Sequence, residues 1–271
     1  MTMDRMPQTA ETNSRLWGAR AHDWANIQEE TCRPVYSAVF DRVGLRPDTS
    51  YLDAGCGSGL AAQIAFERGA CVSGLDAAEN LLAIARTRVP IGNFHAGELE
   101  NLPFPNDSFD LVTGFNSFQY AGDPNAALAE AKRVARQDAK VVIMTWGEPE
   151  GMEAAGLVAA IKPLLPAPPP GALGPFALSG EATLRGFASF AGLSPTEVFD
   201  VSAPWQYPDL ATALRGLKSA GVSVCAIEHS SEEAVDLAYS KSLEPFRRPD
   251  GSYRIGATYR CLVSRFKRHG L

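Results

Sequence analysis

The feature that most constrains this chain is a strand that runs into a glycine-rich turn at residues 50–59, Ser-Tyr-Leu-Asp-Ala-Gly-Cys-Gly-Ser-Gly. Gly55, Gly57 and Gly59 lack a Cβ atom, so the main chain can turn sharply and a flat ligand can approach it without a clash. Residues 60–68 follow as a predicted helix, whose first turn presents unpaired N–H groups and the positive end of the helix dipole. We therefore expect a group that is at least partly anionic at the start of this helix.

A second apolar strand, residues 71–75, leads to an acidic residue. This residue, Asp76, stands seventeen positions after Gly59, where a carboxylate can accept hydrogen bonds from the hydroxyl groups of a ribose. An isolated glycine turn can simply connect a strand to a helix. The order strand, glycine turn, helix, strand and acid instead predicts a nucleoside-binding unit.

Composition argues against several other classes of protein. The chain has 271 residues, with 25 Lys and Arg against 31 Asp and Glu, and its formal net charge is −6. No basic run is long enough to neutralise a phosphate backbone, so a nucleic-acid partner is not expected. The sequence has no apolar stretch of about eighteen residues and no apolar run after its first charges, so we expect neither a membrane span nor a signal peptide.

The five cysteines are scattered and show no Cys-x-x-Cys spacing, so they predict neither a disulfide framework nor a metal site. Cys56 lies inside the glycine turn, but no nearby histidine or asparagine in the sequence could activate its thiol. We interpret Cys56 as a small apolar filler. Together with the lack of a targeting segment, this pattern predicts a cytoplasmic protein.

Four motifs occur in the order that is typical of one family. They are Leu52-Asp53-x-Gly55-x-Gly57-x-Gly59 with Gly74-Leu75-Asp76, then Gly97-Glu98-Leu99-Glu100-Asn101-Leu102-Pro103-Phe104, Ser108-Phe109-Asp110-Leu111-Val112, and Asp123-Pro124. Residues 45–147 thereby resemble the cofactor half of class I S-adenosylmethionine-dependent methyltransferases, closest to the small-molecule, quinone-biosynthesis type (the methyltransferase-11 group). The resemblance implies S-adenosylmethionine as cofactor and methyl transfer to a small-molecule acceptor by in-line displacement.

The resemblance also implies the fold class, which is α/β. We expect a Rossmann-like, seven-stranded, mostly parallel sheet with an antiparallel last strand, helices on both faces, and N-terminal and inserted helical caps. Three segments are predicted: an N-terminal helical cap at residues 1–44, the S-adenosylmethionine-binding core at 45–147, and the remainder at 148–271. The third segment would complete the sheet and carry a lid at 150–180 and inserted cap helices at 205–250.

An N-terminal helix is predicted over residues 13–28, where Trp17 and Trp24 recur at nearly helical spacing with other apolar side chains. The two tryptophans need a surface to bury against. They can fasten the helix to the core or, as the resemblance implies, roof the pocket at the methionine end of the cofactor. The other predicted helices cover 34–43, 60–68, 77–88, 123–136, 151–165, 181–191, 209–220 and 232–246, and the later strands cover 94–96, 109–114, 140–146, 196–201 and 252–263.

The cofactor-binding residues that the resemblance implies come from the glycine turn and the strand ends. Ala77 and Leu81 would flank the adenine ring, and Glu98 stands where relatives usually carry Asp, which accepts a hydrogen bond from the adenine amino group. Glu is one methylene longer, so either the loop lies farther from the adenine or the backbone of Leu99 makes the hydrogen bond to the base. The full predicted set is Trp17, Trp24, Asp53, Ala54, Gly55, Cys56, Gly57, Gly59, Asp76, Ala77, Leu81, Gly97, Glu98, Leu99, Phe115, Asn116 and Gln119.

Candidates for a general base are few. A sulfonium already activates its methyl group, so the protein mainly has to align donor and acceptor, and the need for a base depends on the acceptor atom. Relatives often have a histidine where Gln119 stands, and glutamine cannot act as a base. The remaining candidates are His22 in the N-terminal helix and His229 in the inserted cap, and each can equally be an ordinary surface residue.

Two other functions are compatible with parts of the pattern. Gly57-x-Gly59-x-x-Ala62 with Asp76 also satisfies the dinucleotide fingerprint of an NAD(P)-dependent oxidoreductase. Against that function stand Asp53 before the first glycine, the segment 98–104, and the lack of a second mononucleotide half. A non-catalytic protein that binds S-adenosylmethionine is the other alternative, and turnover would separate it from an enzyme.

Overall fold

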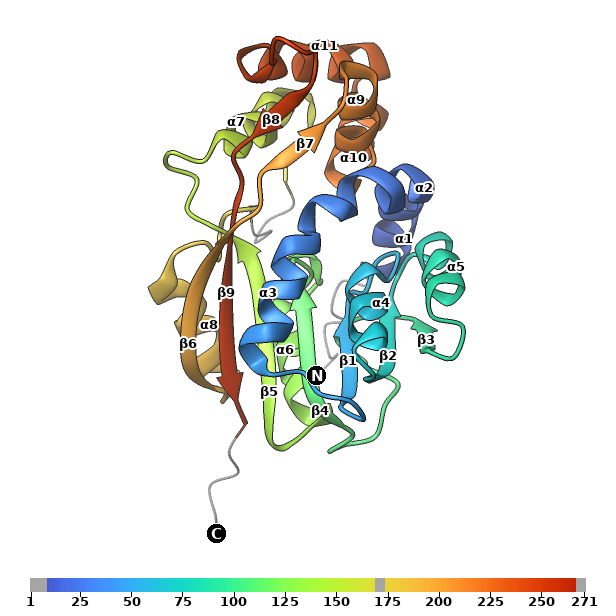
Figure 1. The fold of residues 1–271 in the computed structure, drawn as a ribbon, viewed down its shortest axis with the longest axis vertical. Coiled ribbons are helices and arrows are strands. Elements are labelled where there is room, and N and C mark those ends of the chain that lie inside the picture. The colour runs from blue at the N-terminus through green and yellow to red at the C-terminus, as the bar shows by residue number, and fades with distance from the viewer. Residues whose placement is uncertain (1–8, 169–173, 267–271) are drawn as a thin grey trace, which may run out of the picture.

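The centre of the molecule is a seven-stranded sheet in the order β3-β2-β1-β4-β5-β9-β6 (Figure 1). The structure is a computed structural model and describes residues 9–168 and 174–266. The strands are β1 (Ser50–Ala54), β2 (Cys71–Asp76), β3 (Asn93–Ala96), β4 (Phe109–Phe115), β5 (Ala135–Trp146), β6 (Ser194–Ser202) and β9 (Thr258–Arg265). Strands β1 to β5 are parallel, and β9 runs antiparallel between β5 and β6. The predicted fold class is confirmed.

Helices cover both faces of this sheet, because alternate residues of each strand supply a separate hydrophobic core on each side. Along β5, Val142 and Met144 belong to one core, whereas Val141 and Ile143 belong to the other. The first core lies under α3, α4 and α5, and the second lies under α6 and α8. These helices are α3 (Arg33–Val43), α4 (Leu60–Glu67), α5 (Glu79–Arg88), α6 (Pro124–Val134) and α8 (Glu181–Phe190). Burial on both faces explains why residues 141–146 of β5 are nearly all apolar.

A helical cap lies at the end of the sheet to which the carboxyl ends of β4 and β5 point (Figure 1). It contains α7 (Glu153–Ala160), α9 (Leu210–Lys218), α10 (Gly221–His229), α11 (Glu232–Leu243) and a small sheet of β7 (Trp205–Tyr207) with β8 (Tyr253–Ile255). Helix α7 begins the predicted lid segment and packs against α11. Within the described residues no single helix has the length and apolarity to cross a membrane. Only α9 and α10 taken together, with a bend of 90° between them, have that length and apolarity.

The predicted N-terminal helix over residues 13–28 is wrong as a single element. The chain leaves helical geometry at Arg20, with φ −129° and ψ 44°. It forms α1 (Ala10–Gly18), α2 (Ala21–Asp23), a π-helical turn at Trp24–Gln28 and a 3-10 turn at Glu29–Cys32. The break changes the direction of the chain, so that α1 lies beside α5 and α10 while the following turns reach the glycine-rich loop.

The last predicted strand, residues 252–263, is also divided. Gly256 donates its N–H to the Glu153 carboxylate, and the carbonyl of Ala257 accepts from Ala203 N at 2.9 Å. These bonds end β8 before β9 begins, so β8 belongs to the cap and β9 to the central sheet. Helix α10 was not predicted, because its β-branched and cysteine residues are weak helix formers and its stability comes from burial in the cap.

Candidate functional site

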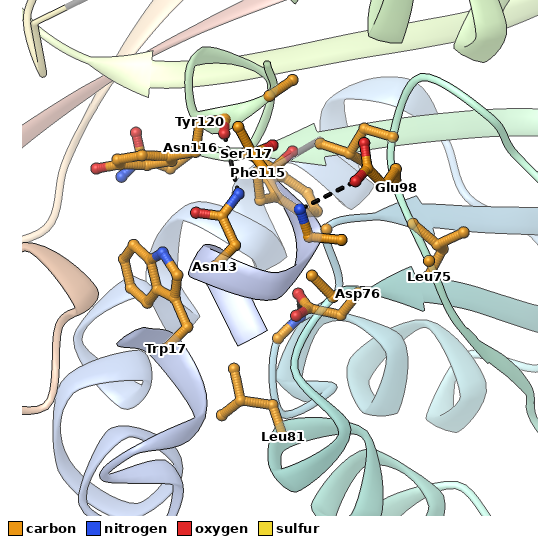
Figure 2. A pocket seen from close by; sticks show the side chains of 18 of the residues that line it. Asn13, Trp17, Leu75, Asp76, Leu81, Glu98, Phe115, Asn116, Ser117 and Tyr120 are labelled. Carbon is orange, nitrogen blue, oxygen red and sulfur yellow. Dashed lines mark hydrogen bonds between the residues drawn. The ribbon is translucent and has the colours of Figure 1, made fainter. Parts of the chain in front are cut away.

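A cavity of about 120 Å³ opens at the carboxyl ends of β1, β2 and β4, where ligands of open parallel sheets usually bind. Figure 2 shows Asp76 and Glu98 on one side of it and Trp17, Asn116 and Tyr120 on the other. Its lining consists of Thr9, Ala10, Asn13, Trp17, Trp24, Cys32, Tyr36, Gly55, Gly57, Leu75, Asp76, Ala77, Leu81, Gly97, Glu98, Leu99, Glu100, Phe115, Asn116, Ser117, Tyr120, Ala121 and Met144. The cavity therefore has an acidic side and an aromatic, mostly apolar side.

Asp76, the last residue of β2, connects this strand to the glycine turn. Its Oδ2 accepts the N–H of Gly57 at 2.9 Å, and its Oδ1 accepts the N–H of Ala78 at 2.8 Å. Burial raises the pKa of Asp76, while these backbone bonds oppose the rise. Each carboxylate oxygen has a further lone pair, so Asp76 can hold the turn in place and still accept a bond from a ligand hydroxyl.

Two of the three glycines are required for packing inside the protein. A Cβ on Gly55 would lie 2.4 Å from the Cβ of Ser117, and a Cβ on Gly59 would lie 2.7 Å from the Cβ of Ala85. Both glycines have φ near +80°, a backbone conformation that other residues rarely adopt. Gly59 thus lets α4 approach α5 closely, and it does not line the cavity.

The predicted anion at the start of α4 is supplied by the chain itself. Glu29 accepts hydrogen bonds from the Ser58 hydroxyl and the Leu60 backbone and forms an ion pair with Arg88. The side chains of Glu29 and Arg88 are only 4% and 15% exposed. Arg88 also donates to the carbonyl of Ala25 at 2.8 Å. This buried ion pair joins the N-terminal segment, the glycine turn and α5.

Asp53 lies beneath the cavity and not in its lining. Its Oδ1 accepts the hydroxyl hydrogen of Thr113 at 3.0 Å, and the Tyr51 hydroxyl lies 2.7 Å from the same threonine oxygen. Burial raises the pKa of Asp53 from 3.8 to about 7. The structure therefore places the Asp53 carboxylate inside the core, next to Thr113.

The raised pKa of Asp53 predicts a loss of stability with rising pH. Between pH 3.8 and about 7 the unfolded carboxyl is ionised while the folded one keeps its proton, so the free energy of unfolding falls over this range and levels off above it. From pH 5 to pH 8 this contribution amounts to about 3 kcal/mol. Urea titrations at pH 5 and pH 8 measure the fall in the free energy of unfolding, and we expect Asp53→Asn to remove this contribution. Asp41→Asn changes a side chain that is 72% exposed and should keep the wild-type dependence of stability on pH. An equal change of the free energy of unfolding with pH in Asp53→Asn and wild type would contradict the prediction.

Aromatic residues of the N-terminal segment roof the cavity. The ring of Trp17 makes edge contacts with Trp24 and Tyr120, with centroid distances of 5.0 and 5.4 Å. The Trp24 Nε1–H is buried and has no hydrogen-bond partner among the described residues. Burial raises the pKa of Tyr120 to about 12, so its hydroxyl stays protonated at neutral pH. The tryptophans thus both pack the segment onto the core and enclose the cavity.

The structure brings most of the predicted cofactor residues to the cavity. The predicted residues outside its lining are Asp53, Ala54, Cys56, Gly59 and Gln119. His22 and His229 are exposed and also lie outside the lining. Gln119 is buried and donates to the Asn116 side chain, and it thereby orients a residue that does line the cavity.

Several lining residues are absent from the predicted cofactor-binding set. They are Thr9, Ala10, Asn13, Cys32, Tyr36, Leu75, Glu100, Ser117, Tyr120, Ala121 and Met144. Leu75 and Met144 lie near the carboxyl ends of β2 and β5, so the rule that ligands bind at such ends could have indicated them. Residues such as Ala10 and Tyr36 reach the cavity only through the path of the N-terminal segment, for which the sequence carries no local signal.

Known proteins that are similar to this chain are methyltransferases. The sequence model described as a methyltransferase domain matches residues 52–143. The predicted resemblance of these residues to class I, S-adenosylmethionine-dependent methyltransferases is confirmed. The matched range contains the glycine turn, Asp76 and the strand ends that line the cavity.

Named relatives agree with this family. A demethylmenaquinone methyltransferase of Renibacterium salmoninarum is 33% identical over 146 residues, which are 54% of this chain and 57% of that protein. A malonyl-(acyl-carrier protein) O-methyltransferase of Serratia marcescens is 35% identical over 36% of this chain and 39% of its own length. The chain thus spans about half the length of these relatives. The homologous enzyme of Erwinia pyrifoliae is 29% identical over 81% of this chain and 80% of that protein.

Solved structures show the same fold. The YcgJ protein of Bacillus subtilis has a TM-score of 0.59 at 22% identity and covers 87% of this chain and 98% of its own. The (4+2)-cyclase SpnF has a TM-score of 0.61 at 16% identity, with 97% of each chain covered. Because a cyclase shares the architecture, the fold alone does not decide the reaction.

The cofactor that this family implies, S-adenosylmethionine, fits the residues of the cavity. Asp76 presents a carboxylate to the lining. A Cβ on Gly57 would lie 3.2 Å from Glu29 Oε1 and 3.5 Å from Trp24 Nε1, so a larger residue would narrow the space between the turn and the roof. The unpaired Trp24 N–H supplies a donor at the same place. Main chain, carboxylate and donor are the groups that an adenosyl amino acid requires.

Proposed function

We propose that this protein transfers the methyl group of S-adenosylmethionine to a small-molecule acceptor in the described cavity. The observation that carries the proposal is the position of Asp76, which lines the cavity and accepts the N–H of Gly57. In this arrangement Asp76 would hold the ribose hydroxyls, and the main chain at Gly55 and Gly57 would support the amino-acid end. Ala77, Leu81, Glu98 and Leu99 would surround the adenine.

The bound cofactor supplies a methyl group that its sulfonium already activates. The residues of the chain then have to align the acceptor with that methyl group and exclude water. Cys32, Tyr36, Phe115 and Met144 provide an apolar surface at the carboxyl ends of β4 and β5. This surface is the proposed acceptor side of the cavity.

The charges of the lining favour an acceptor that is not an anion. Asp76, Glu98 and Glu100 are the charged side chains among the lining residues that the structure describes. The described lining has no Lys, Arg or His side chain, so the protein itself provides no cation to bind a carboxylate acceptor. Burial raises the pKa of Tyr36 well above its ordinary value, so this hydroxyl is a poor base at neutral pH. An uncharged acceptor whose reacting atom needs little help in losing a proton agrees best with these residues.

Thermal unfolding with S-adenosylmethionine, S-adenosylhomocysteine, NAD and NADP in parallel tests the proposal. A ligand at 100 times its Kd raises the free energy of unfolding by about 2.7 kcal/mol, and we expect only the two adenosyl ligands to do so. Stabilisation by NAD or NADP alone would indicate an oxidoreductase instead. Release of S-adenosylhomocysteine in the presence of uncharged phenols, ketones and amines then distinguishes an enzyme from a protein that only binds the cofactor.

We also propose, as part of this function, that the protein works in the cytoplasm without a nucleic-acid or membrane partner. The net charge of −6 and the lack of a long basic run support this setting. All five cysteines are unpaired, as is usual in a reducing compartment. The segments 1–44, 45–147 and 148–271 are proposed as N-terminal cap, cofactor core and remainder, of which residues 1–8, 169–173 and 267–271 lie outside the described chain.

A further inference from the structure

Glu98 forms a contact with the N-terminal helix that the sequence did not predict. Its Oε1 accepts the backbone N–H of Ala10, the first residue of α1, at 3.1 Å (Figure 2). The first N–H groups of a helix have no partner within the helix, and the positive end of the helix dipole favours a carboxylate there. Both residues line the cavity. The bond therefore joins α1 to the loop after β3 across the mouth of the proposed cofactor site.

The rest of α1 is held along the same edge of the cavity. The Asn13 side chain donates to the carbonyl of Tyr120 at 3.1 Å, and the Asn80 side chain donates to the carbonyl of Gly18 at 3.0 Å. These two bonds fasten the middle and the end of α1. The Glu98 bond at Ala10 fastens its beginning.

Helix α1 and the inserted cap are also joined. Arg15 pairs with Glu228 of α10, and a Cβ on Gly221 would lie 2.8 Å from the ring of Trp17. The following turn adds a pair between Arg20 and Glu232 at 2.9 Å. These ion pairs are partly exposed, so each contributes little by itself. Together with the tight fit at Gly221 they give α1 a firm support on the side away from Glu98.

We propose that Glu98 is a positioning residue that holds α1 as a lid over the bound cofactor and so slows release of the cofactor and its product. This inference rests on the proposed function for the identity of the ligand. With Oε1 on the N–H of Ala10, Oε2 remains for a donor of the ligand, such as an amino group. Ligand binding and closure of α1 then strengthen each other, because both orient the same carboxylate.

The length of the side chain is the property that the lid requires. Glutamate spans the distance from the loop to Ala10, whereas aspartate keeps the charge but is shorter by one methylene. Glu98→Asp should therefore lose the bond to α1 and retain a carboxylate for the ligand. Glu98→Gln keeps the length and an acceptor oxygen, so it should keep most of the bond to Ala10 and serve as the conservative variant.

Hydrogen exchange of the α1 amides and the rate of S-adenosylhomocysteine release, followed by tryptophan fluorescence, test the lid. In ligand-free Glu98→Asp we expect the amides at the start of α1 to exchange about tenfold faster than in wild type. We expect S-adenosylhomocysteine to dissociate from this variant about tenfold faster, because the closed state is less populated. In Glu98→Gln the α1 amides should exchange nearly as slowly as in wild type. Glu11→Asp makes the same change at an exposed position of α1 and should leave both rates unchanged.

The outcomes separate the lid from the proposed function. Wild-type exchange of α1 in ligand-free Glu98→Asp would overturn the lid, even if S-adenosylhomocysteine bound more weakly, since Glu98 would then act on the ligand alone. Failure of wild-type protein to bind S-adenosylhomocysteine would overturn the proposed function. The exchange of α1 in the ligand-free variants would still decide whether Glu98 holds the helix.

Discussion

Arg88→Met is expected to lower the free energy of unfolding by about 3–5 kcal/mol, because it leaves the buried carboxylate of Glu29 without its cation. Arg88 pairs with Glu29 and also donates to the Ser58 carbonyl at 3.0 Å. Methionine has a similar volume but can satisfy neither group. Urea denaturation at pH 7 measures the change.

A neighbouring arginine provides the control for this prediction. Arg86 is on the same helix, and its pair with Glu79 is exposed, with 41% and 61% of the two side chains accessible. Arg86→Met should therefore cost less than about 1 kcal/mol. Adding Glu29→Gln to Arg88→Met should recover part of the loss by removing the buried charge. Similar costs for the two arginine variants would show that the Glu29 pair does not hold these elements together.

The second large effect concerns ligand binding. S-adenosylhomocysteine at 100 times its Kd should stabilise the wild-type protein by about 2.7 kcal/mol, and at the same concentration it should give Asp76→Ala no measurable stabilisation. Alanine removes the carboxylate that lines the cavity and also the acceptor of the Gly57 N–H. The variant loses both the group that would bind ribose hydroxyls and the bond that shapes the turn. Calorimetric titration gives the same comparison as a binding constant.

The free energy of unfolding without ligand shows how much of the effect of Asp76→Ala comes from the lost bonds in the turn and not from lost ligand binding. The N–H groups of Gly57 and Ala78 lose their acceptor in Asp76→Ala, which should cost about 1–3 kcal/mol for each group that stays buried. Asp41→Ala changes a carboxylate that is 72% exposed on α3 and should respond to ligand as wild type does. An unchanged ligand response in Asp76→Ala would mean that the cofactor binds elsewhere.

Local patterns predicted much of the site. Strand β1, the glycine turn, α4, β2 and Asp76 follow one another within 27 residues, from Ser50 to Asp76, so their order in the sequence fixes their neighbourhood in space. Asp76 lines the cavity because a parallel β2 must end beside the turn after β1. The same local order predicted Gly55 and Gly57, which also line the cavity.

Other parts of the site depend on contacts between distant residues. The sequence indicated an anion at the start of α4, but not that Glu29 would provide it through a pair with a residue 59 positions away. It indicated three similar glycines, but not that Gly55 would pack against Ser117 and Gly59 against Ala85. The exposed positions of His22 and His229 likewise follow from the packing of the cap.

The sequence by itself determined the order of strand, turn and helix from β1 to β2, the bare main chain of the turn and the carboxylate at the end of β2. These features depend on backbone conformation and on residues close together in the chain. Only the tertiary structure decided that α1 lines the cavity and that its first residue, Ala10, binds Glu98, 88 positions away. Contacts of this kind depend on the path of the whole N-terminal segment. Local spacing in the sequence does not specify which distant residues will pair, and burial and charge pairing in the folded chain determine the partners.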